Sequence, residues 1–151
     1  MTTIVATPQD LLPLVGKKFG PTPPLRIEQQ RIDSFADATG DHQWIHVDPE
    51  RAATGPFGKT IAHGYLSLSL AGHFLPQLIA VESFSMGVNY GVDNVRFPAP
   101  VPVDSDLYAE GEIISVEAFK GGYKMVLRIS MQVDGADRPS CIVDTISVFY
   151  P

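Results

Sequence analysis

The stretch Tyr65-Leu66-Ser67-Leu68-Ser69-Leu70-Ala71-Gly72-His73-Phe74-Leu75-Pro76-Gln77-Leu78-Ile79 decides the fold. Its leucines and Phe74 recur at spacings of three and four, which predicts a helix over 65–79 that is apolar nearly all round. Such a helix is buried, because a surface helix keeps one polar face. Pro76 cannot donate a hydrogen bond to the carbonyl of Gly72, so the helix is expected to kink or end near that point.

The C-terminal half of the chain has strand patterns. Apolar and polar residues alternate with a period of two from Tyr123 to Val133, broken only by Val126. Further strands are predicted over 89–97, 107–118 and 140–150, with turns at 120–122 and 134–137. Short turns between consecutive strands imply an antiparallel sheet. The pattern therefore predicts an α+β fold in which an antiparallel sheet wraps around a central helix.

Shorter elements are expected before the central helix. The first 25 residues are rich in proline and glycine and are predicted to be an irregular lead-in. A helix that is capped by Asp33 or Ser34 is expected to end at Gly40 in a left-handed conformation. In chain order the predicted elements are a helical turn over 10–15, a strand over 26–30, a helix over 32–39, a loop over 41–49 and a helical turn over 49–53 with Asp48 as its N-cap.

Composition narrows the class of protein. With 151 residues, 44% of them hydrophobic and 19% charged, residues 1–151 are expected to form one globular domain. The single cysteine, Cys141, excludes an intrachain disulfide. A net charge of −6 without a basic block argues against nucleic-acid binding. The chain shows neither a membrane-spanning run nor a secretory signal pattern, so a cytoplasmic protein without a membrane span is expected.

The segment from Thr39 to Pro49 places two acids and two histidines close together. An acid and an imidazole can activate a water molecule by general acid–base catalysis. Further along, His63-Gly64 precedes the central helix, where backbone N–H groups lack intrahelical acceptors and carry partial positive charge. The residues alone leave two interpretations open, because Asp41 also suits an Asx turn and His46 also suits a core histidine.

The sequence disfavours a metal site in this segment. His42 and His46 form an H-x₃-H pair, but they lie in a predicted loop and no cysteine pair accompanies them. The prediction is no metal and no cofactor. His42 is expected on the surface, and His73 is expected on the central helix with a local partner.

Together these residues resemble the MaoC-like, R-specific enoyl-CoA hydratase family (hydratase 2), which has the hot-dog fold. The segment 35–52 matches the family signature at Phe35, Thr39, Gly40, Asp41, Ile45, His46 and Ala52. Gln43 stands where the family usually has Asn, and Trp44 where it usually has Pro. Two further segments match, namely His63-Gly64 and the run from Val95 to Val101, so the resemblance covers roughly residues 26–150.

The resemblance implies a single hot-dog domain that hydrates trans-2-enoyl-CoA to (R)-3-hydroxyacyl-CoA in fatty-acid metabolism. It assigns the activated water to Asp41 and His46, and the oxyanion-binding N–H to Gly64. Oxyanion or substrate binding is further expected at His63, Gln43 and Arg96. The resemblance also implies an acyl-CoA thioester substrate and a homodimer that pairs through sheet edges.

Two other functions remain open from the sequence. One is a hot-dog acyl-CoA thioesterase that uses Asp41, and the other is a non-catalytic acyl-CoA-binding module, which the Gln43 and Trp44 departures leave open. The cations that could meet CoA phosphates are Lys59, Arg51, Lys120 and Arg96, and the aromatics that could line an acyl tunnel are Phe35, Phe57, Tyr65 and Trp44. A solvated face explains each of these cations as well, and core packing explains each of the aromatics.

Overall fold

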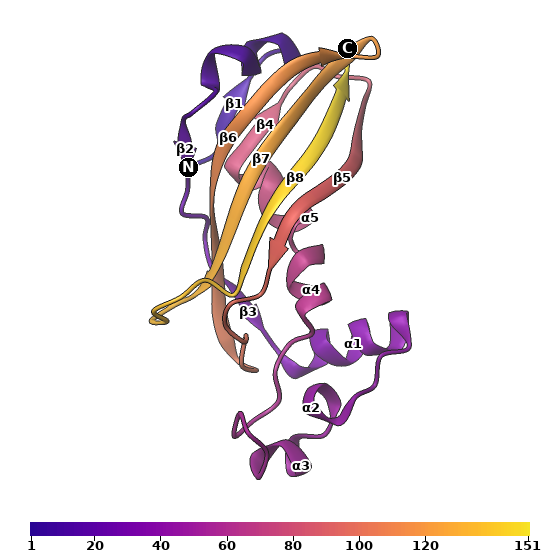
Figure 1. The fold of residues 1–151 in the computed structure, drawn as a ribbon, viewed down its shortest axis with the longest axis vertical. Coiled ribbons are helices and arrows are strands. Elements are labelled where there is room, and N and C mark those ends of the chain that lie inside the picture. Colours follow the sequence, from indigo (N-terminus) through magenta and orange to yellow (C-terminus); the bar gives the residue numbers. More distant parts are fainter.

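Four long strands form most of the main sheet, which curves around the central helical segment (Figure 1). These strands are β5 (Met86–Arg96), β6 (Ser105–Phe119), β7 (Gly122–Val133) and β8 (Cys141–Tyr150). The computed structural model describes residues 1–151 and orders the six-stranded sheet β2-β6-β7-β8-β5, with β3 also paired to β6. All its pairs are antiparallel. The α+β prediction, with an antiparallel sheet wrapped around a helix, is confirmed.

The central helix is divided in two, whereas a single helix over 65–79 was predicted. It consists of α4 (Gly64–Ser69) and α5 (Ala71–Leu78). The N–H of Leu70 lies 3.1 Å from two carbonyls, those of Leu66 and Ser67, as in a tightened helical turn. Pro76 lies inside α5, which ends two residues later at Leu78, whereas the break at Leu70 falls six residues before the proline.

The C-terminal end of α5 packs against the sheet where two glycines leave space for a side chain. Leu78 is 1% exposed. A Cβ atom placed on Gly20 or on Gly111 would lie 3.1 Å from a methyl carbon of Leu78. Two positions without side chains therefore make the space that this leucine fills, which sets how α5 sits on β6.

The first 25 residues are more regular than the predicted lead-in. They contain β1 (Thr3–Val5), the 3-10 helix η1 (Pro8–Leu14) and β2 (Lys18–Phe19). β1 pairs in parallel with β4 (Ile79–Val81), and β2 extends the sheet beside β6. Their strand partners are far away in sequence, so local patterns in this proline-rich segment did not reveal them.

The segment that precedes the central helix also differs from the prediction at its boundaries. β3 (Leu25–Ile27) is shorter than the predicted strand, and α1 (Gln29–Thr39) begins earlier than predicted. Its N-cap residue is Glu28, not Asp33 or Ser34. Gly40 ends α1 with φ of 80°, which confirms the predicted left-handed conformation.

Two helical turns follow α1 at one end of the sheet (Figure 1). The predicted loop over 41–49 contains a helical turn, α2 (Trp44–Val47). The next turn, α3 (Pro49–Ala53), matches its prediction, because the Asp48 carboxylate accepts the N–H of Arg51 at 3.1 Å. Among all these helices, none has both the length and the apolar character that crossing a membrane requires.

Replacing Leu78 by alanine should destabilise the fold strongly. We expect Leu78→Ala to lower the free energy of unfolding by about 2–5 kcal/mol, because the surrounding backbone cannot collapse into the space left behind. Leu12→Ala is the matched control, since Leu12 is 41% exposed. Urea denaturation measures both, and an equal loss in the two variants would contradict the packing argument.

Candidate active site

Three side chains from separate segments meet beside the start of α4. They are Asp41, His46 and His63, and one side-chain oxygen or nitrogen of each lies within 4.8 Å of those of the other two. Asp41 is exposed, whereas His46 and His63 are 7% and 2% exposed. The site thus combines a carboxylate open to solvent with two buried imidazoles.

One hydrogen bond sets the orientation of His46. Its Nδ1 lies 2.7 Å from the backbone carbonyl of Ile61. A carbonyl only accepts hydrogen bonds, so Nδ1 carries the proton and Nε2 keeps its lone pair. The N–H of Ile61 in turn donates to the carbonyl of Ile45 at 3.0 Å. Ile61 therefore bonds both the His46 side chain and the backbone of α2, and the lone pair of His46 Nε2 is left free.

The segment 60–62 is held by distant parts of the chain. The N–H of Ala62 donates to the carbonyl of Val101 at 2.8 Å, and the N–H of Val103 donates to that of Thr60 at 2.9 Å. Gln29 adds a further link, because its Nε2 donates to the carbonyl of His46 at 2.7 Å while its Oε1 accepts from the Thr60 hydroxyl. Sequence reasoning missed this support, since no local pattern marks a glutamine that bonds across the fold.

Burial keeps the His46 imidazole neutral near pH 7. Loss of hydration lowers the pKa of its imidazole below the ordinary value of 6.5. The bond to Ile61 and the Asp41 charge act to raise this pKa, and His63 acts to lower it, but burial is the largest effect. His46 is therefore neutral at pH 7, with a lone pair available on Nε2.

Gly64 is the first residue of α4, and His63 is its N-cap. At this position the N–H has no intrahelical acceptor and lies at the positive end of the helix dipole. A Cβ on Gly64 would lie 3.2 Å from the Phe97 ring, so glycine allows this aromatic to cover the helix start. The first turn of α4 therefore places the Gly64 N–H, which has no intrahelical acceptor, next to the acid–histidine cluster.

The two remaining predicted residues, Gln43 and Arg96, are both exposed. Gln43 is exposed, and its backbone N–H lies 3.4 Å from Asp41 Oδ1. Arg96 ends β5, is exposed and donates to the carbonyl of Val95 at 2.7 Å, without an ion pair to Asp41.

The two other histidines lie away from the cluster. His42 is exposed and pairs with Asp37 at 2.9 Å. It is therefore a surface residue, as predicted, and forms no pair with His46. His73 is exposed on α5 and has a local partner in Gln77, 3.1 Å away, which also agrees with its prediction.

The geometry of the two imidazoles is poorly suited to a shared metal ion. The rings of His46 and His63 are stacked, with centroids 3.9 Å apart and an interplanar angle of 23°. Ligands of one tetrahedral ion point their in-plane lone pairs at a common centre, whereas stacked rings lie side by side. The stacking therefore disfavours an ion shared by both rings.

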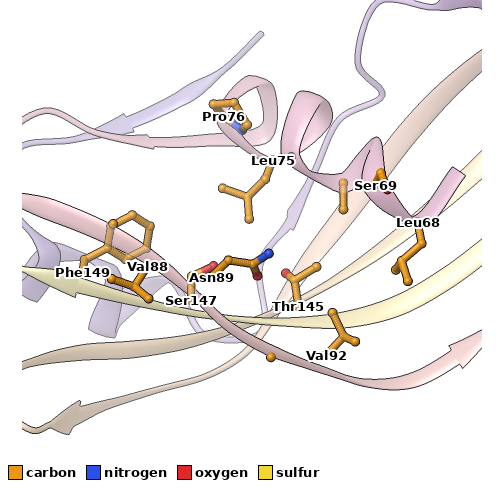
Figure 2. Close-up of a pocket in the computed structure, with 14 residues that line it drawn as sticks. Leu68, Ser69, Leu75, Pro76, Val88, Asn89, Val92, Thr145, Ser147 and Phe149 are labelled. Atoms are coloured by element: carbon orange, nitrogen blue, oxygen red, sulfur yellow. The ribbon is translucent and has the colours of Figure 1, made fainter. Parts of the chain in front are cut away.

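Two cavities flank the central helix. A cavity of about 310 Å³ is lined by Gly64, Ile61 and Phe97, among others. A larger cavity of about 540 Å³ lies between α4–α5 and strands β5 and β8, and Figure 2 shows Leu68 and Leu75 facing Thr145 across it. The smaller cavity lies next to the acid–histidine cluster, because Gly64 and Ile61, whose carbonyl bonds His46, both line it.

An antiparallel sheet wrapped around a helix, with an acid–histidine cluster beside the first turn of that helix, defines a hot-dog protein. The chain belongs to the MaoC like domain family, whose model matches residues 10–133.

Known proteins of this family are similar over most of their length. The 3-hydroxyacyl-thioester dehydratase Z of Mycobacterium tuberculosis is 44% identical over 138 residues, which cover 91% of each chain. The (R)-specific enoyl-CoA hydratase of Aeromonas caviae is 30% identical, over 78% of this chain and 79% of the relative. The solved structure of the A. caviae (R)-hydratase gives a TM-score of 0.69 at 27% identity, covering 91% of this chain and 96% of that one.

The lowered pKa of His46 predicts how stability depends on pH. Below about pH 6.5 the unfolded chain binds a proton at His46 that the folded chain resists, so the free energy of unfolding falls as pH falls. In His46→Gln this decline should be less steep, as measured by urea denaturation between pH 7.5 and 5.

His42 provides the control with the opposite sign. Its pKa is raised by the hydrogen bond to Asp37, so it contributes stability at low pH that is lost as pH rises through the folded pKa. His42→Gln should therefore make the decline toward acid steeper. Equal slopes in the wild type and His46→Gln would count against a buried, neutral His46.

Proposed function

We propose that the chain is a hydro-lyase that reversibly hydrates trans-2-enoyl-CoA to (R)-3-hydroxyacyl-CoA in fatty-acid metabolism. The observation that carries this proposal is the pairing of the exposed Asp41 carboxylate with the Nε2 lone pair of His46 beside Gly64. Relatives whose names specify 3-hydroxyacyl-thioester dehydration and R-specific enoyl-CoA hydration support it, because the two names describe one reaction in opposite directions.

The pair provides the means to activate water. Asp41 accepts one hydrogen of the water, which fixes its orientation, and Nε2 of His46 accepts the other as general base. The water oxygen then bonds to C3 of the enoyl group while the C2–C3 π electrons move toward the thioester. Carbon C2 takes up the proton that His46 has gained, which restores the neutral imidazole. The same steps run backwards remove water from a 3-hydroxyacyl thioester.

The first N–H of α4 stabilises the charge that builds on the thioester oxygen. Gly64 offers this donor beside a cavity of about 310 Å³, which we assign to the thioester. A donor aimed at a developing oxyanion contributes roughly 3 kcal/mol to transition-state stabilisation. The absence of a side chain at Gly64 lets the substrate approach the backbone closely.

Substrate contacts at the rim complete the proposal. The Gln43 side chain is exposed and caps nothing, so its amide is available to a polar group of the substrate. The exposed guanidinium of Arg96 next to Phe97 can take a CoA phosphate. Both assignments place polar recognition outside the cavity and leave its apolar wall to the thioester.

A homodimer is proposed through strand β5. This strand is 11 residues long and lies at the edge of the sheet, with no neighbour on its outer side. Several of its apolar side chains are more than two-fifths exposed, namely Met86, Tyr90 and Val92. A long, apolar, unpaired edge pairs readily with a second copy, and a two-fold axis would join the two sheets.

Asp41→Asn and His46→Gln should each lower kcat for crotonyl-CoA hydration by roughly 100-fold or more, since each removes one half of the water grip. Loss of absorbance of the enoyl thioester measures the rate. Asp48→Asn is the matched control, because Asp48 caps α3 and an amide oxygen can keep that bond. Wild-type rates in both Asp41 and His46 variants would sink the mechanism.

Product analysis separates hydration from the other two functions. Thiol detection reports CoA-SH, which only a thioesterase releases, and chiral analysis of the product decides its R configuration. Tight binding of an enoyl-CoA that stays chemically unchanged would indicate a binding module instead. The proposal expects an (R)-3-hydroxyacyl-CoA product and no free thiol.

Val92→Lys should shift the protein from dimer toward monomer, because a lysine on an edge strand opposes edge-to-edge pairing. Light scattering coupled to size-exclusion chromatography measures the mass. Ile4→Lys is the control, since Ile4 is 60% exposed on a strand outside the main sheet. A monomeric wild-type protein would rule out the dimer.

A further inference from the structure

His63 lies behind the proposed reacting pair and is almost fully buried. It is 2% exposed, and its Nε2 lies 2.9 Å from the backbone carbonyl of Asp41. Because a carbonyl only accepts, Nε2 carries the proton and Nδ1 is the acceptor. Nδ1 is buried without a hydrogen-bond partner.

The same ring supports His46 from one face. The two imidazoles stack with centroids 3.9 Å apart, and Phe35 packs against His63 with centroids 4.9 Å apart. One buried side chain thus contacts both partners of the proposed pair. It bonds the backbone that carries the Asp41 carboxylate, and it contacts the ring that carries the reactive Nε2.

We infer that His63 is a positioning residue that holds Asp41 and His46 at their working separation through one hydrogen bond and one ring stack. The inference rests on the proposed function, because the separation matters for the gripped water. It revises the expected role of His63 in oxyanion or substrate binding, since a ring that is 2% exposed has no open surface to offer a substrate.

Two substitutions separate the two contacts. His63→Phe keeps a ring that can stack on His46 and removes the donor to Asp41. His63→Gln keeps a donor of similar reach and removes the ring. We expect each to lower kcat for crotonyl-CoA by roughly 10- to 100-fold, the range that a shift of about 1 Å in a reacting group produces. KM should stay within about twofold, because substrate contacts are untouched.

The controls test whether the effect is local. His42→Phe and His42→Gln make the same changes at an exposed histidine that pairs with Asp37, and both should keep wild-type kcat. Thermal unfolding and circular dichroism check that the His63 variants fold. If His63→Phe fails to fold, His63→Gln and His63→Asn decide the question.

A double substitution tests whether His63 acts through His46. In a His46→Gln background, adding His63→Gln, which removes the stacking ring and keeps the donor to Asp41, should lower the residual kcat by less than about twofold, because the ring that it supports is already absent. A full, independent loss would overturn the inference. So would wild-type kcat in folded His63→Phe and His63→Gln.

The test of the positioning role of His63 can be separated from the test of the proposed function. A wild-type protein that hydrates no enoyl thioester contradicts the function alone. In that case crystal structures of the His63 variants decide the inference. A distance between the Asp41 carboxylate and His46 Nε2 that matches the wild type in both variants would overturn it.

Discussion

The site depends on the hydrogen bond that His46 Nδ1 donates to the carbonyl of Ile61 over 2.7 Å. This bond fixes the tautomer and the plane of the imidazole, and so decides which nitrogen is free. It works only because Ile61 is itself fixed, through Ala62 to Val101 and through Thr60 to Val103. A buried histidine without such a partner could rotate or change its tautomer. The orientation of the His46 ring is therefore a consequence of backbone pairing between two loops.

The position of the Gly64 N–H follows from core packing in a similar way. Gly64 begins a helical segment whose far end packs against the sheet at Leu78, in the space left by Gly20 and Gly111. At its near end the Phe97 ring lies against Gly64. Contacts with the sheet and with Phe97, which follows β5, therefore set both ends of the segment.

Much of the fold could be predicted from the sequence, because the strong signals are local. Period-two alternation gave β7, apolar residues all round gave the buried helix, and Gly40 marked the end of α1. The break at Leu70 and the strand β1 were missed, since each depends on partners or crowding elsewhere in the chain. The candidate pair was found through its motif.

The support of that pair was not found in the same way. Gln29, Thr60 and the Ile61 carbonyl carry no local signature, and only the folded chain brings them to His46.

The two departures from the family motif, Gln43 and Trp44, also concern the support of the pair. Trp44 is the first residue of α2, a position where proline would set the backbone angle in advance. Here the guanidinium of Arg51 lies 4.4 Å from the Trp44 ring centroid, and a Cβ on Gly55 would lie only 3.0 Å from that ring. Packing on both sides therefore restrains the turn that carries His46, by tertiary contacts in place of a restricted φ angle. A side chain at position 55 would require the Trp44 ring to move by a few tenths of an ångström, so Gly55 belongs to the packing that holds this turn.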